Sequence, residues 1–150
     1  MSSNPFAPPN AKVTDPSNVQ PPPPREIRTA CRLILLSLVL GLVTLAPGIR
    51  PERPGDAEVP LLFTLGLTVF FSGLTVWLAL KLYGGRNWAR WVMLAYLAAG
   101  WWVAGSELQE NFALSPVSGV IDVVCAAMEV VACWLFIAGK GARWFRPPVA

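Results

Sequence analysis

Two acidic residues, Asp122 and Glu129, lie inside one long apolar stretch of the sequence, residues 117–139. A carboxyl group in such a stretch is costly to place in a bilayer, so it usually has a partner or a function. Seven residues of α-helix turn through about 700°, which puts the two acids within about 20° of each other. Cys133 falls on the same line, and Cys125 lies about 60° away. The spacing therefore predicts one polar helix face that turns inward.

The opposite face of the same segment is apolar, and we expect it to meet lipid. Its members are Val120, Val124, Val131 and Leu135. The second apolar segment offers hydroxyl groups at the depth of Glu129, and such groups hydrogen-bond across helix interfaces. We therefore predict Ser72 or Thr68 as its partner. The candidate intramembrane polar site comprises Asp122, Glu129, Ser72 and Thr68.

Three interpretations of Glu129 stay open at this level. In the first, a protonated Glu129 is hydrogen-bonded and joins helices together. In the second, it contacts another membrane protein or a second copy of this chain. In the third, it is a proton or cation site in a small oligomeric transporter.

Catalytic chemistry has little support in the sequence. There is no histidine, which removes the commonest general base and the commonest metal ligand. The three cysteines, Cys31, Cys125 and Cys133, are isolated, and we interpret them as small packing residues. We expect no enzymatic activity, no cofactor, no metal site and no nucleic-acid partner.

The elements that must position the acids are four apolar segments, each close to the roughly 20 residues that cross a bilayer core. They cover about residues 29–47, 60–82, 90–106 and 117–139. Over the whole chain, 54% of residues are hydrophobic and 14% are charged. Short connections make consecutive helices antiparallel neighbours. The predicted fold is all-α, a four-helix transmembrane bundle of up-down-up-down topology.

The predicted domain organisation places a proline-rich cytoplasmic tail before the helices. Residues 1–26 contain almost no large apolar side chains, so they cannot offset the entropy of ordering and are expected to be disordered. The membrane domain covers residues 27–146, and residues 147–150 form a C-terminal tail.

Basic residues fix the predicted orientation, because cytoplasmic loops carry an excess of Lys and Arg. Ten of the twelve lie on one side: Lys12, Arg25, Arg28, Arg32, Lys81, Arg86, Arg90, Lys140, Arg143 and Arg146. Only Arg50 and Arg53 lie on the other side. We therefore expect both termini in the cytoplasm, with the lipid bilayer as the chain's first partner.

Two basic and aromatic segments share an Ala-Arg-Trp core and are predicted at the same membrane face. Their side chains either anchor helices at the interface or contact anionic lipid head groups. The candidate lipid contacts are Arg86, Trp88, Arg90, Trp91, Arg143 and Trp144.

Three short motifs carry a resemblance: residues 4–9 (NPFAPP) with 13–15 (VTD), residues 85–90 (GRNWAR) and residues 142–145 (ARWF). The chain resembles uncharacterised small four-helix bacterial inner-membrane proteins. The resemblance implies an envelope location and no particular activity. Small multidrug transporters also have four helices and a membrane glutamate, but theirs lies in the first helix, which has no acid here. The favoured function is non-enzymatic association with other membrane components; the alternative is a small proton- or cation-coupled transporter that uses Glu129.

Overall fold

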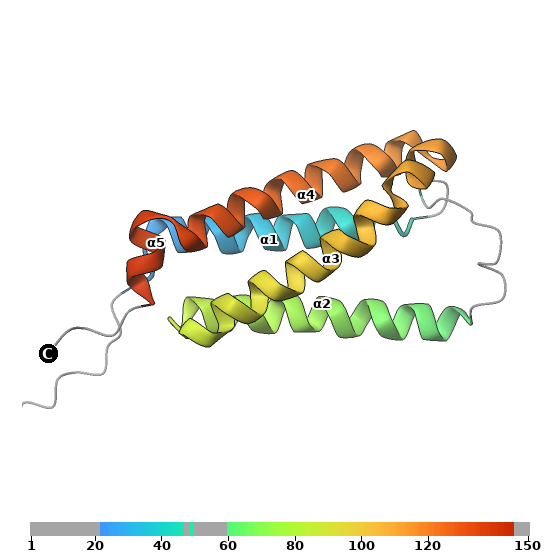
Figure 1. The fold of residues 1–150 in the computed structure, drawn as a ribbon. Helices are drawn as coiled ribbons and strands as arrows, with labels where there is room; N and C mark the ends of the chain where they lie inside the picture. Colours follow the sequence, from blue (N-terminus) through green and yellow to red (C-terminus); the bar gives the residue numbers. More distant parts are fainter. Residues whose placement is uncertain (1–21, 47–48, 50–59, 146–150) are drawn as a thin grey trace, which may run out of the picture.

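The computed structural model describes residues 22–46, 49 and 60–145, and this part of the chain is helical without a strand (Figure 1). Its helices are α1 Arg25–Val43, α2 Leu61–Tyr83, α3 Asn87–Leu114, α4 Pro116–Ile137 and α5 Gly139–Trp144. The predicted all-α class is confirmed. The tail that was predicted to be disordered, apart from its last five residues, and the C-terminal residues 147–150 lie outside the described residues.

The four long helices run back and forth along one axis, and α5 folds beside the start of α1 (Figure 1). α1 packs against α4 and α2, and α3 packs against α4 and α2. Between the diagonal pairs, α1 with α3 and α2 with α4, the described residues make no close backbone contact. α3 crosses the others obliquely: it starts beside the end of α2 and finishes beside the start of α4 (Figure 1).

The third helix is longer than the predicted range of 90–106, and this boundary was wrong. Residues 107–114 contain no glycine or proline and continue the helix, where the sequence suggested a loop. α3 ends where Pro116 disfavours the helical conformation of the residue before it. Ser115 is extended there, and its hydroxyl accepts a hydrogen bond from the Ser118 amide at 3.4 Å, which caps α4.

Two other boundaries differ from the prediction. α1 begins at Arg25 and ends at Val43, so the last two residues assigned to the tail are helical. α4 ends at Ile137, two residues early, because Ala138 is extended and the chain turns into α5. Gly141 permits this turn, since a Cβ there would lie 2.1 Å from the Leu135 carbonyl oxygen.

Buried side chains gather at one end of the molecule, where α1 and α3 begin and α2 and α4 end. The core there comprises Ile27, Ala30, Cys31, Ile34, Leu78, Leu82, Ala89, Met93, Leu97, Ala132, Cys133, Phe136 and Phe145. This half of the molecule is closely packed, and α5 closes it with Phe145.

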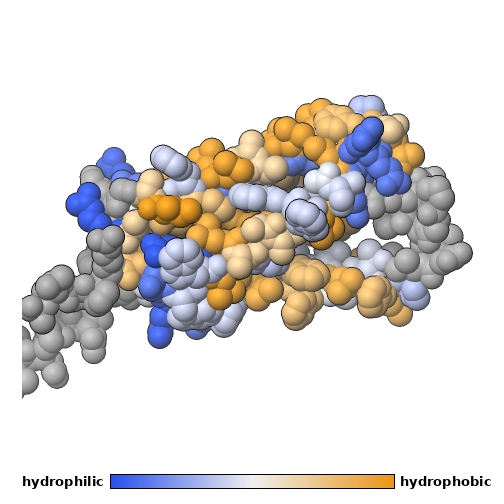
Figure 2. Space-filling view, viewed as in Figure 1, coloured by the Kyte–Doolittle hydropathy of each residue, from blue (hydrophilic) through white to orange (hydrophobic). Residues whose placement is uncertain are grey.

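The other half is more open. From Leu62 to Leu74, α2 has no buried side chain, and Leu62 and Val69 are 83% and 72% exposed. Figure 2 shows an opening between this half of α2 and the remaining helices. The opening follows from the oblique path of α3, which leaves α2 as it approaches α4 (Figure 1).

Among the described residues, two helices are long and apolar enough to cross a membrane by length and composition, Leu62–Tyr83 and Pro116–Ile137. Only 17% and 11% of their most apolar windows are buried, so most of this apolar surface faces outward. The expectation that Val120, Val124 and Val131 are exposed is confirmed. Leu135 was assigned to that face wrongly, because it is half-buried against the core beside α5.

Candidate functional site

Glu129 is the centre of a polar contact that joins three helices. The Ser37 hydroxyl of α1 donates to Oε1 at 2.5 Å, and the indole Nε1 of Trp101 on α3 donates to Oε2 at 2.8 Å. Indole N–H is a donor only, so Oε2 must act as its acceptor. Both carboxyl oxygens of the half-buried Glu129 are thus engaged, at the border between the packed and the open half.

The Ser37 backbone adds a fourth residue to this cluster. Its carbonyl oxygen lies 3.5 Å from the Cys125 thiol, which donates to it one helical turn from Glu129. Within the described residues, no cationic side chain pairs with Glu129, and no group of three or more metal-ligating side chains occurs. The site can hold a proton or bind hydrogen-bond donors, and its donors are neutral.

The predicted partners of Glu129, Ser72 and Thr68, were wrong. The Thr68 hydroxyl donates to the Thr64 carbonyl of its own helix at 2.9 Å, and the half-buried Ser72 is not bonded to Glu129. The reason is topological, because α2 and α4 are a diagonal pair separated by α1 and α3. Ser37 could have been found from the sequence as the one hydroxyl residue near the middle of the first apolar segment.

Asp122 lies on the same face of α4 but belongs to a separate contact. Its Oδ2 accepts a hydrogen bond from Asn111 Nδ2 at 2.9 Å. Seven residues of helix put the two acids about 10 Å apart along α4, so they share a face and no partner. Asn111 was missed because it was assigned to a loop, whereas it lies in the last turn of α3.

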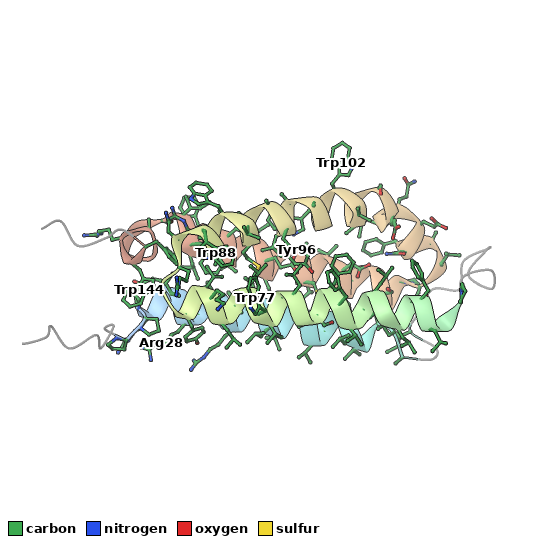
Figure 3. All side chains as sticks on the ribbon, turned by 90° about the horizontal axis from the view of Figure 1, so that it is seen from below. Arg28, Trp77, Trp88, Tyr96, Trp102 and Trp144 are labelled. Carbon is green, nitrogen blue, oxygen red and sulfur yellow. The ribbon has the colours of Figure 1, made fainter. Side chains whose placement is uncertain are left out.

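A third polar contact joins α2 to α3. The Thr75 hydroxyl lies 3.1 Å from the Tyr96 hydroxyl, and Tyr96 points toward α2 (Figure 3). The Thr75 hydroxyl also lies 2.9 Å from the Phe71 carbonyl oxygen. The Cys31 thiol of α1 donates to the Ala79 carbonyl oxygen of α2 at 4.0 Å, so each adjacent pair of long helices has a side-chain hydrogen bond among the described residues.

The predicted lipid contacts lie at the packed end, around the starts of α3 and α1. The Arg90 guanidinium lies over two rings, with its Cζ 4.9 Å from the Trp91 centroid and 5.2 Å from the Phe145 centroid. Its Nε is buried and has no hydrogen-bond partner in the part of the chain that the structure describes, and the same holds for Nε1 of Trp144. Arg86, Trp88, Trp91 and Arg143 are exposed.

A second aromatic cluster lies at the same end. The rings of Trp77 and Trp88 are 5.5 Å apart, and Lys81 Nζ lies 5.6 Å from the Trp77 centroid (Figure 3). The structure thus separates a central acid, held by neutral donors, from a basic and aromatic end. No family model, curated protein or solved structure matches this chain.

Proposed function

We propose that this chain is a non-enzymatic multi-pass protein of a bacterial inner membrane and that it acts by associating with other membrane components. In this proposal α1 to α4 form an up-down-up-down transmembrane bundle. Both termini face the cytoplasm, on the side of the packed end. The resemblance to small four-helix inner-membrane proteins supports the same location.

The observation that carries the proposal is the combination of an apolar exterior with a half-open interior. α2 and α4 expose most of their apolar residues, as lipid-facing helices do. Figure 2 shows the most hydrophilic residues toward the two ends of the molecule and apolar ones between them. The amino-terminal half of α2 has few neighbours in its own chain, which leaves a helix face for a partner.

Labelling at the two ends of α3 tests the transmembrane arrangement. We expect Arg86→Cys to react with a membrane-impermeant thiol reagent only from the cytoplasmic side and Gln109→Cys only from the opposite side. Both positions are exposed and 23 residues apart, or about 35 Å along a helix. Arg86 is preferable to Gly85, whose φ of 66° strains any other residue. Labelling of both cysteines from the same side contradicts the arrangement.

Site-specific photocrosslinking tests the association. A photoreactive amino acid at Val69, in the open half of α2, is expected to form a discrete adduct with a protein. The same residue at Val130 of α4, which is also exposed and near the middle of its helix, is the matched control and should yield lipid adducts. An adduct of twice the chain mass identifies a second copy as the partner. Lipid adducts alone at both positions contradict the association.

The alternative function is a small oligomeric transporter coupled to protons or cations through Glu129. The geometry at Glu129 favours it specifically, because an acid held by two neutral donors beside an open half can exchange a proton. Proton uptake into proteoliposomes that Glu129→Gln abolishes would favour transport over association.

A further inference from the structure

The packed end of the molecule has an excess of positive charge that the described chain does not balance. Seven cations whose side chains the structure describes lie there: Arg25, Arg28, Arg32, Lys81, Arg86, Arg90 and Arg143. Glu26 is the one described acid at this end, and none of the seven forms an ion pair with a described residue. A surface of this kind attracts anions, and a bilayer supplies them as lipid phosphates.

Arg90 differs from the other six cations in contacting two aromatic rings. It is half-buried, and its guanidinium lies over the Trp91 and Phe145 rings, with Cζ 4.9 and 5.2 Å from their centroids. Lys81 is also half-buried but lies over one ring, that of Trp77. Aromatic rings that contact the face of a guanidinium leave its N–H groups free to form hydrogen bonds in the plane of the guanidinium. Because the side chain is already ordered, binding an anion costs it less conformational entropy than it costs an exposed arginine.

Two buried donors at this end have no acceptor among the described residues. One is Nε of Arg90, and the other is Nε1 of Trp144, which precedes Phe145 in the chain. A buried N–H without an acceptor is destabilising, so native structures rarely keep one unless something else supplies the oxygen. A phosphate offers several oxygens and matches the fork of a guanidinium.

The surroundings favour a phosphate that carries acyl chains. The Trp91 ring, over which the guanidinium lies, is 59% exposed, so exposed apolar surface adjoins the guanidinium. A free anion would gain nothing from this surface, whereas a phospholipid covers it with its chains.

From these contacts we propose that Arg90, with Trp91, Trp144 and Phe145, forms a binding site for the phosphate of an anionic phospholipid. The proposal rests on the membrane location proposed above. The site differs from a general basic surface in that one arginine, which lies over the ring of Trp91 on α3 and the ring of Phe145 directly after α5, provides most of the selectivity.

Lipid titration of the delipidated, detergent-solubilised full chain, followed by native mass spectrometry, tests the site. We expect phosphatidylglycerol to bind the wild type more tightly than phosphatidylcholine does. Arg90→Gln should weaken phosphatidylglycerol binding by roughly tenfold, the loss of one bidentate charge-assisted contact. Arg90→Lys keeps the charge but not the fork and should weaken it by a few fold. Arg32→Gln, the same charge change at an exposed residue of α1, should have less than about a twofold effect.

Three results overturn the proposal. They are equal losses in Arg90→Gln and Arg32→Gln, unchanged binding in Arg90→Gln, and full competition by inorganic phosphate at the lipid concentration, which assigns the site to a free anion. The lipid-induced rise in melting temperature is measured on each variant, so a general loss of stability is not taken for a loss of binding. Membrane integration of Arg90→Gln, followed by carbonate extraction, separates failure of this site from failure of the proposed membrane location.

Discussion

Gly141→Ala is expected to destabilise the packed end of the molecule by about 1–3 kcal/mol, as overpacking of a close contact does. A Cβ at this position would lie 2.1 Å from the Leu135 carbonyl oxygen, which belongs to backbone and cannot rotate away. It would also lie 3.5 Å from Cδ1 of Ile27, a fully buried residue of α1. α5 must therefore shift, and Phe145 moves away from the core and from Arg90.

Thermal unfolding in detergent checks this expectation. Gly100→Ala is the matched control, because a Cβ there meets no atom within 4 Å and α3 is helical around it. Alanine is the better helix former by up to about 1 kcal/mol, so the control should be neutral or stabilised. Similar melting temperatures for Gly141→Ala and Gly100→Ala would mean that α5 does not pack as described. A displaced Phe145 should also weaken phosphatidylglycerol binding in Gly141→Ala alone.

Much of the fold follows from local sequence signals. The apolar segments gave the four long helices, and α2 matches its predicted range within one residue at each end. Gly84 and Gly85 mark a turn, and Gly85 takes a φ of 66° there. The end of α3 was harder to predict. Glu107, Gln109 and Glu110 suggested a loop, but residues 107–114 contain no glycine or proline, and the helix continues through them.

The site was predictable in part. Helical periodicity correctly put Asp122 and Glu129 on one face of α4, but it could not say which helix faces them. Ser37, Trp101 and Asn111 come from segments 92, 28 and 11 residues away in the sequence. Their selection depends on the order of helices around the molecule and on the oblique path of α3, which no local pattern encodes. Tryptophan serves both as an anchor at membrane interfaces and as a hydrogen-bond donor between helices, so the residue type alone does not tell which role Trp101 has.

Glu129→Leu is expected to weaken the association of α1, α3 and α4 by about 1–2 kcal/mol, whereas Glu129→Gln should stay within about 0.5 kcal/mol of wild type. Leucine leaves the Trp101 N–H without its acceptor, and the indole ring has no other polar atom that could form a hydrogen bond instead. Ser37 is less affected, because its hydroxyl can turn to a carbonyl of its own helix. Glutamine keeps an acceptor oxygen for Trp101 and a polar group for Ser37. The higher intrinsic affinity of leucine for lipid should not reverse this order, since in the proposed transmembrane arrangement folded and dissociated helices are both in the membrane.

A double-mutant cycle with Trp101→Phe isolates the contact. Phenylalanine removes the N–H, so the cost of Glu129→Leu should fall when both changes are combined. Reversible unfolding in mixed micelles measures each variant, and full additivity of the two single changes would show that the 2.8 Å contact contributes nothing. Glu129→Gln then distinguishes the proposed association from the alternative, transport. If it folds normally and still forms the Val69 crosslink while proton uptake is absent in every variant, the acid joins helices and the protein acts by association. If Gln folds normally but loses a proton uptake that wild type shows, the same hydrogen bonds hold a transport site, because only an ionisable group can release the proton it binds.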